Sequence, residues 1–351
     1  MPKEKPDWAH EETDRLIEEL EKVLSGAYAE AEDAINAKLA DYLRRFEAKD
    51  EKWRLWVAQG KKTEDEYRAW RTGQLMMQQR WENLRDEIAQ DLVRADEIAQ
   101  AIINGEMPEI YALNHGWETY MIEKQLGMTT GYTLYNADAV RELLKEDPLL
   151  LPQRKIAIPE DLRWNKRRIQ AVMLQGVLQG KSIPELARCL SPVTDGNWKN
   201  AIRNARTMAT GAQNAGRLDA LKRAQSKGAR LRQTWLATLD MRTRHEHRQL
   251  DGETVDVGEP FLVDGYEIRY PGDPAAPGYL VYNCRCRLQG QVRGFETDFK
   301  GFDLRSDPDV EGMTYEQWKE NKVEKPRKIT HQAEVSEKMR NYYYSRYARR
   351  K

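Results

Sequence analysis

The stretch TWLATLDMRTRHEHRQLDG at residues 234–252, with the sequence NCRCR at residues 283–287, decides how this chain is organised. Two of the three cysteines and two of the five histidines lie between these limits. Alternating Leu and Thr predict a strand over Leu231–Leu239, and short apolar runs predict further strands at Glu267–Tyr270 and Tyr279–Tyr282. Turn-forming pairs separate them, so residues 228–292 are predicted to form a small β-rich module.

The first hundred residues carry a helical pattern instead. No proline occurs over residues 7–107, and apolar residues recur at helical spacing among Asp and Glu. A break at residues 59–62 precedes Thr63–Glu66, which has the spacing of a capping box, and the second helix is expected to stop near residues 105–108. Residues 1–107 are therefore predicted to form a hairpin of two long antiparallel helices. The alternative is a coiled coil that assembles subunits, although the apolar spacing is irregular for a heptad.

The remainder of the chain divides into three segments. A helical connector over residues 108–158 contains predicted helices at Ile110–Leu126 and Ala137–Leu144 and ends in an extended link over residues 149–159. A basic helical domain over residues 159–227 is predicted to contain helices Pro159–Leu178, Ser182–Leu190 and Trp198–Ser226. Residues 293–351 are predicted as a basic C-terminal tail, with a short element at Phe295–Phe302 and a capped helix at Met313–Trp318. The fold class is mainly α with a small β-rich C-terminal module.

Composition limits the class of protein. The 351 residues are 32% charged and include ten Trp, which indicates a folded globular chain rather than a disordered one. No run of eighteen apolar residues occurs, so no ordinary membrane-spanning helix is expected. The first residues lack the apolar core of a secretory signal, and three cysteines fit a reducing cytoplasm better than a disulfide framework.

A net charge of zero conceals regions of opposite sign. Residues 1–150 hold 20 Lys and Arg against 32 Asp and Glu, whereas residues 163–232 hold 15 basic and 3 acidic side chains. The basic segment is suited either to nucleic acid or to an acidic protein surface, including the acidic half of its own chain. The candidates for nucleic-acid contact are Arg163, Lys166, Arg167, Arg168, Arg203, Arg217 and Arg223.

The module also contains a candidate metal site, made of His245, His247, Cys284 and Cys286. Zinc takes thiolate and imidazole ligands in a tetrahedron, and a structural zinc ion would stabilise a module with little core of its own. On strands, the two histidines would share one face and the two cysteines another, so the pairs would meet across neighbouring strands. The alternative is that the cysteines are small buried residues and the histidines lie exposed in an Arg-rich turn.

The module resembles the C-terminal part of phage head morphogenesis proteins, the minor capsid family related to the Mu F protein and the SPP1 portal-associated head protein. The likeness is closest over about residues 200–290 and extends more loosely back to about residue 100. Many relatives carry cysteine at the positions of Arg244 and His247, so the resemblance alone does not transfer a metal site. Besides His247, Cys284 and Cys286, the residues that match the family's pattern and are expected to be structural are Arg206, Thr207, Thr238, Asp240, Arg242, Arg244, Leu250, Asp251, Gly252, Asn283 and Arg285.

The resemblance implies a non-enzymatic phage minor head protein that acts in procapsid assembly and head morphogenesis. It implies a place in the virion head, at the portal vertex, after assembly in the host cytoplasm. The implied partners are the portal protein and other capsid proteins, with packaged phage DNA as a further contact. Some members of the family carry fused enzymatic or toxin domains, and the roughly 65 residues after Cys286 are too few and too charged to form one.

Two other functions are compatible with the residues. Asp240, His247 and the two cysteines could form the centre of a metal-dependent nuclease or hydrolase, with phosphate contacts from the basic segment. The basic segment alone would also suit a DNA-binding protein with no role in the virion. Against an enzyme, the sequence contains no Ser-centred elbow, phosphate-binding glycine loop or His-Glu-x-x-His helix.

Overall fold

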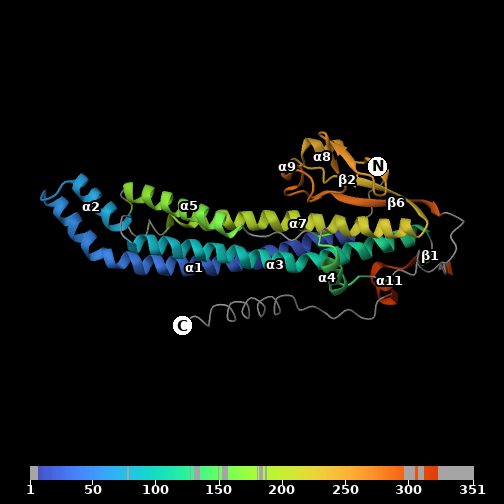
Figure 1. Ribbon diagram of the computed structural model, residues 1–351, viewed down its shortest axis with the longest axis horizontal. Helices are drawn as coiled ribbons and strands as arrows, with labels where there is room; N and C mark the ends of the chain where they lie inside the picture. Colours follow the sequence, from blue (N-terminus) through green and yellow to red (C-terminus); the bar gives the residue numbers. More distant parts are fainter. Residues whose placement is uncertain are drawn as a thin grey trace. The chain divides into compact units, whose positions relative to one another are not determined.

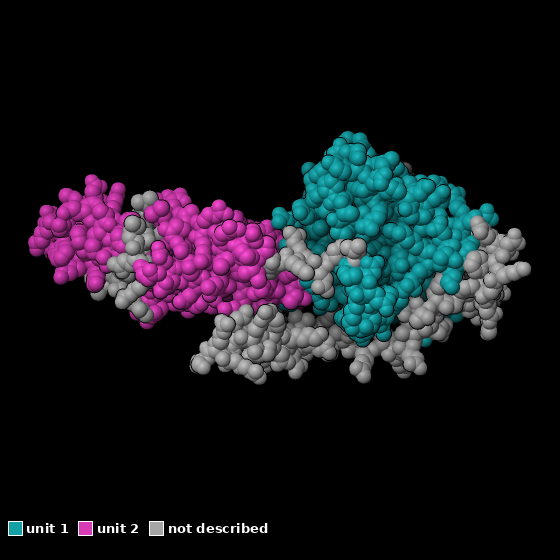
Figure 2. All heavy atoms as spheres, in the orientation of Figure 1, with its two compact units in different colours: residues 1–20, 102–153, 203–351 teal, residues 21–101, 154–202 magenta. Residues whose placement is uncertain are grey.

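The structure is a computed structural model that describes residues 7–76, 79–126, 128–129, 135–148, 150–151, 157–179, 181, 185, 188–295, 305–306 and 312–322. Long helices and a small β-containing region near residues 229–295 make up the described chain (Figure 1), which confirms the predicted fold class. Two compact units are present (Figure 2): unit 1 holds residues 1–20, 102–153 and 203–351, and unit 2 holds residues 21–101 and 154–202. Each unit thus combines segments far apart in sequence, and the five consecutive segments expected from the sequence stay a prediction.

Helices α1 (Trp8–Ala58) and α3 (Gln79–Leu126) run in opposite directions (Figure 1). In unit 1 the side-chain amide of Asn114 donates to Thr13 Oγ1 over 2.8 Å, and in unit 2 Lys38 Nζ lies 2.5 Å from Asp91 Oδ2. Residue numbers fall along α3 as they rise along α1, which is the antiparallel arrangement predicted for the N-terminal helices.

Helix α2 (Glu64–Met76) begins at the capping box predicted from its spacing. The backbone N–H of Glu66 donates to Thr63 Oγ1 over 3.1 Å, and the N–H of Thr63 donates to Glu66 Oε2 over 2.9 Å. These reciprocal bonds satisfy two backbone donors that have no partner within the helix, so the cap defines where α2 starts.

The predicted end of the second long helix near residues 105–108 is wrong. Helix α3 continues through Pro108 and absorbs the separate helix predicted at Ile110–Leu126. Proline removes one backbone donor and crowds the preceding turn, but burial of apolar side chains on both sides of it favours a continuous helix. Ile103, Met107 and Ile110 are all almost fully buried.

Unit 2 has its own apolar core between the middle of α1, the start of α3 and helix α5 (Ile158–Leu178). Trp81 anchors it, and its indole N–H donates to Gln170 Oε1 over 2.7 Å. The predicted helix at Pro159–Leu178 is therefore present, whereas most of the predicted Ser182–Leu190 helix and of the 149–159 link lies outside the described residues. The core consists of Ile35, Leu39, Tyr42, Trp81, Leu84, Ile88, Ala89, Leu92, Ile169, Met173, Leu190 and Val193.

Two short helices of unit 1 also follow the sequence predictions. Helix α4 (Ala137–Glu146) is capped by Asn136, whose Oδ1 accepts from the N–H of Ala139 over 2.7 Å. Helix α11 (Tyr315–Lys322) packs Tyr315 and Trp318 into an aromatic cluster with side chains of α1 and α3. The predicted element at Phe295–Phe302 lies almost entirely outside the described residues, as does the basic tail after residue 322.

The β-rich module is a set of small antiparallel sheets. Strand β2 (Ala229–Leu236) pairs with β3 (Thr254–Asp256) on one side and with β6 (Arg287–Phe295) on the other, in a register that sets Trp235 opposite Leu288. Strands β4 (Phe261–Val263) and β5 (Tyr266–Ile268) form a hairpin. A separate pair joins β1 (Met128–Thr129) to β7 (Arg305–Ser306).

Two segments of the module are single helical turns, one of them predicted to be a strand and the other placed on a strand in the geometry considered for the metal site. Residues around His247 form α8 (His245–Gln249), and the strand predicted at Tyr279–Tyr282 is α9 (Gly278–Val281). The N–H of Arg248 donates to the carbonyl of Arg244 over 3.0 Å, and that of Tyr282 to Gly278 over 2.9 Å. Both segments are too short for side-chain periodicity to separate a strand from a turn of helix.

Helix α7 (Ser191–Ser226) positions the module, and all of the contacts described here lie in unit 1. Its Gly211 meets Gly272 so closely that a Cβ on either would lie 2.8–3.0 Å from a backbone atom of the other. The side-chain amide of Asn214 donates to the carbonyls of Pro271 and Cys286, and Asn214 Oδ1 accepts from the N–H of Leu288 over 2.7 Å. These contacts attach the loop before β6 to helix α7.

Among the described residues, every helix is either too short or too polar to span a membrane.

Candidate functional site

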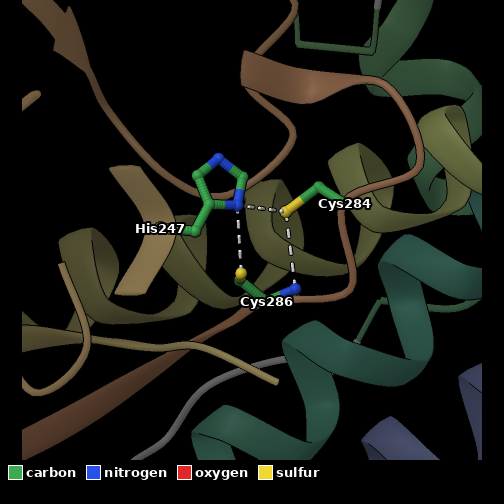
Figure 3. Close-up of side chains that lie close together, drawn as sticks. All are labelled: His247, Cys284 and Cys286. Carbon is green, nitrogen blue, oxygen red and sulfur yellow. Dashed lines mark hydrogen bonds between the residues drawn. The ribbon is translucent and has the colours of Figure 1, made fainter. Parts of the chain in front are cut away.

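Three of the four predicted metal ligands meet in one buried cluster. Nδ1 of His247 lies 3.6 Å from Sγ of Cys284 and 3.4 Å from Sγ of Cys286, and each of the three residues is 2% exposed. Figure 3 shows both sulfur atoms approaching the same nitrogen of the ring. No disulfide joins them, because both cysteines are free thiols. The cluster combines two soft sulfur donors with one imidazole, which is a donor set suited to zinc.

The fourth predicted ligand, His245, lies elsewhere. His245 is the first residue of α8 and lies two positions before His247. Its Nε2 lies at the surface, 3.0 Å from the side-chain amide nitrogen of Gln249. Residues two apart on a strand share a face, but residues two apart on a helix point in different directions. The expectation that both histidines face the cysteines was wrong because it assumed a strand.

The pKa values of the two thiols are shifted in opposite directions. The hydrogen bond with Cys284 and the imidazole of His247 together lower the pKa of Cys286 to about 5, against the opposing effect of burial. The same hydrogen bond, together with burial, raises the pKa of Cys284 well above its ordinary value. Cys286 is therefore the more acidic thiol of the pair.

The backbone around the cysteines is held from α7. Asn283 adopts a left-handed conformation with a φ of 54°, which turns the chain into the Cys-x-Cys segment. Thr210 Oγ1 donates to the carbonyl of Cys284 over 2.6 Å, and Asn214 Nδ2 donates to that of Cys286 over 3.1 Å. The N–H of Asn283 donates to Thr207 Oγ1 over 3.1 Å. These hydrogen bonds to α7 hold the backbone of residues 283–286 and so limit how far the two sulfur atoms can move.

Asp240 lies in a loop at residues 237–244, called here the tip loop, and takes no part in the cluster of ligands. Its carboxylate receives two bonds from Arg285, of 2.7 and 2.8 Å, and one of 2.8 Å from the N–H of Arg242. The hydrogen bond from Arg285 is the main reason why the pKa of Asp240 is held well below its usual range. Thr238 Oγ1 also donates to the carbonyl of Arg285 over 2.6 Å. Through these bonds the carboxylate of Asp240 holds the tip loop in one conformation.

The remaining motif residues also make structural contacts. Asp251 Oδ1 accepts from the N–H of Ala237 over 2.8 Å, and Gly252, with a φ of 79°, donates its N–H to the carbonyl of Trp235 over 2.8 Å. Leu250 is buried, and Arg244 donates to the carbonyl of Tyr282. Arg206 is exposed on α7.

One of the seven residues predicted to contact nucleic acid is not accessible. Arg217 is buried and bonds to Asp7, so the prediction for this residue is wrong. Lys166 pairs with Asp86 over 2.8 Å, Arg168 stacks on the ring of Trp164, and Arg223 lies over the ring of Tyr135. The exposed members of the set are Arg163, Arg167 and Arg203.

Several residues of the site carried no sequence prediction. Trp235 packs against His247 and Phe261, with ring centroids 5.4 Å apart in each case, and forms an apolar wall of the cluster. Thr243 Oγ1 accepts from the N–H of Asp240 over 3.0 Å, which helps to close the tip loop. The spacing Asp240-x-x-Thr243 is typical of such side-chain turns and could have indicated this contact.

The part of the chain that carries the cluster is similar to known proteins. Residues 167–289, which include helix α7 and the whole cluster, match the family described as Phage Mu protein F like protein. The chain is also 26% identical over 280 residues to Minor head protein GP7 of Bacillus phage SPP1, and the match covers 77% of this chain and 85% of that protein. The chain is thus similar to the Mu F-like minor head proteins.

A second relative of the chain has an enzyme's name. It is 28% identical over 207 residues to NAD(+)–arginine ADP-ribosyltransferase EFV of Enterococcus faecalis. That match covers 58% of this chain but only 41% of the enterococcal protein, so this chain spans less than half of that relative's length. No solved structure matches the chain.

Proposed function

We propose that this protein is a non-enzymatic minor component of a phage head that acts in procapsid assembly at the portal vertex. The observation that carries the proposal is the match to a minor head protein over 85% of that protein's length. The portal protein and other procapsid proteins are the partners it would bind. It would assemble with them in the host cytoplasm and remain in the virion head.

The tip loop supports a protein partner. Leu239 and Met241 are 63% and 99% exposed, and they flank Asp240. The bonds of Asp240 to Arg285 and to the N–H of Arg242 hold the loop in one conformation. A loop that is already ordered loses little entropy when it binds, so exposed apolar side chains on it are well suited to insert into a partner.

We expect the double change Leu239→Ser and Met241→Ser to lower incorporation into particles by at least about tenfold, equivalent to ~1.4 kcal/mol of lost binding. The chain would be co-expressed with the portal, scaffold and major capsid proteins of the same genome, and sedimented particles would be probed for it. Leu55→Ser is the matched control, because Leu55 is 54% exposed but lies in α1 of unit 2. Absence of the unchanged chain from particles would contradict the proposed function, whereas wild-type incorporation of the double variant would contradict only the role of the tip loop.

The same preparations also test the enzymatic alternatives. Phage DNA would be examined for cleavage, and transfer of ADP-ribose from NAD to arginine would be measured, with the unchanged chain and with Asp240→Ala and His247→Ala. The engagement of Asp240 with Arg285 and the burial of His247 support the absence of both activities. Turnover that disappears in the His247→Ala variant would overturn the non-enzymatic proposal.

Contact with packaged DNA is the second part of the proposal, and the exposed Arg167 and Arg203 support it. Each arginine that neutralises a phosphate contributes about 0.9 to the slope of log K against log salt, so Arg167→Ala and Arg203→Ala should each reduce that slope by about 0.9. Binding to duplex DNA would be measured by fluorescence anisotropy over a salt series. Lys22→Ala, an exposed position in the acidic helix α1, serves as the control with an unchanged slope. An unchanged chain whose affinity does not respond to salt would rule out this contact.

A further inference from the structure

The spacing of the three ligand atoms in the buried cluster matches what a tetrahedral metal ion requires. With Zn–S bonds of about 2.3 Å and Zn–N bonds of about 2.05 Å, tetrahedral angles place nitrogen and sulfur about 3.6 Å apart. Nδ1 of His247 lies 3.6 Å from Sγ of Cys284 and 3.4 Å from Sγ of Cys286. All three ligand atoms lie within 4.8 Å of one another. One ion could therefore contact all three without a large movement of any of them.

Two sets of contacts hold the segment that carries the cysteines. Thr210 and Asn214 donate to the carbonyls of Cys284 and Cys286, so the backbone next to the sulfur atoms is positioned from α7. Arg285, between the two cysteines in the sequence, pairs with Asp240 at 2.7 Å. Its positive charge is therefore already matched by a carboxylate. Outer contacts of this kind orient metal ligands in proteins.

We propose that His247 Nδ1, Cys284 Sγ and Cys286 Sγ bind one zinc ion, and that water or a small external ligand occupies the fourth position. The set is confined to these three because no fourth His, Cys, Asp or Glu ligand atom joins them among the described residues. A donor set of two thiolates and one imidazole selects zinc over magnesium and calcium, which prefer oxygen. The ion would join α8 to the Cys-x-Cys segment and stabilise a module built of short strands.

A metal-free arrangement would use the same atoms differently. Two thiols and an imidazole can share hydrogen bonds and need no ion. Nε2 of His247 is buried and has no hydrogen-bond partner among the described residues, whereas metal-bound histidines usually donate this second N–H. The same three side chains would thus bind one another in the metal-free cluster and an ion in the metal-bound cluster. Measurement of the metal content distinguishes the two.

The test is the zinc content of the full chain. The chain would be expressed with added zinc, dialysed against metal-free buffer and analysed by mass spectrometry, and we expect one zinc ion per chain. Cys284→Ser and Cys286→Ser should each weaken zinc affinity by more than the ~10–100-fold that changes to outer-shell partners cause. The matched controls are Cys189→Ser and His245→Ala, which alter a cysteine and a histidine outside the cluster and should leave the zinc content unchanged.

A cobalt measurement on the unchanged chain keeps the proposal testable even where a variant fails to fold. One equivalent of Co²⁺ should give a thiolate-to-cobalt charge-transfer band and the strong visible bands of a tetrahedral site, and added Zn²⁺ should remove both. An unchanged chain that retains no zinc and shows no thiolate band would overturn the proposal. So would zinc retained at the wild-type level by both cysteine variants, because the ion would then be bound elsewhere.

Discussion

Replacement of Arg217 by methionine is expected to lower the free energy of unfolding by about 3–5 kcal/mol, because it removes the bidentate partner of a largely buried carboxylate and leaves it only the contact with Arg287. Arg217 is 1% exposed and bonds to both oxygens of Asp7, at 2.6 and 2.8 Å. It also donates to Asn114 Oδ1 and to the carbonyl of Leu288, each over 3.0 Å. One guanidinium therefore connects α7 to the chain at the start of α1, to α3 and to strand β6, all within unit 1.

Urea unfolding followed by circular dichroism would measure this effect. Arg203→Met is the matched control, since Arg203 is an exposed arginine of the same helix that lies over the ring of Tyr282, and its replacement should change stability by less than about 1 kcal/mol. A loss of less than about 1 kcal/mol at position 217 would mean that Asp7 finds water or another cation when Arg217 is absent.

The pH dependence of the same pair has a definite sign. Burial alone would raise the pKa of Asp7, but the charge and hydrogen bonds of Arg217, with a contribution from Arg287, lower it from 3.8 to about 2. A carboxyl with a depressed pKa stabilises the fold above its unfolded pKa, and that contribution is lost as the pH falls through the folded value. The difference between the unchanged chain and Arg217→Met should therefore be largest above about pH 4 and should shrink towards pH 2.

Gly216→Ala is expected to make the chain less stable than Gly105→Ala by about 1–3 kcal/mol. Both glycines lie in helices of unit 1, so both variants share the gain of about 1 kcal/mol in helix propensity. A Cβ at Gly216 would lie 2.4 Å from the carbonyl oxygen of Tyr111 and 3.2 Å from the N–H nitrogen of His115, whereas one at Gly105 meets nothing within 4 Å. The backbones of α3 and α7 would have to separate to admit the methyl group.

Thermal and urea unfolding of the two variants, made side by side, would give this difference directly. Equal stability of Gly216→Ala and Gly105→Ala would show that α3 and α7 move apart at little cost, and the close approach at Gly216 would then have no structural importance. A Gly105→Ala variant that is itself destabilised would instead show that the propensity gain does not apply in this part of α3.

Local features of the chain were readable from the sequence because each depends on residues a few positions apart. The capping box at Thr63–Glu66 and the strand observed as β2 both follow from the spacing of residues close together in the sequence. The Asp240 to Cys286 motif identified the Mu F-like module for the same reason, since its residue types and spacings are unusual in combination. The end predicted for the second long helix was wrong because the low helix propensity of Pro108 is outweighed by the burial of apolar side chains on both sides of it. That burial depends on contacts with distant segments, so the local sequence does not reveal it.

The sequence alone determined that the chain is mainly helical with a small β-rich module, and that two cysteines and two histidines of this module are candidates for a metal site. Only the tertiary structure decided that His247 meets Cys284 and Cys286 while His245 does not, because a turn of helix at α8 points the two rings in different directions. Only the tertiary structure decided that Arg217 is buried against Asp7, 210 positions away in the chain, rather than exposed to nucleic acid. Periodicity reports which residues share a face, but which residue pairs with which depends on contacts between distant segments, and no spacing in one sequence records them.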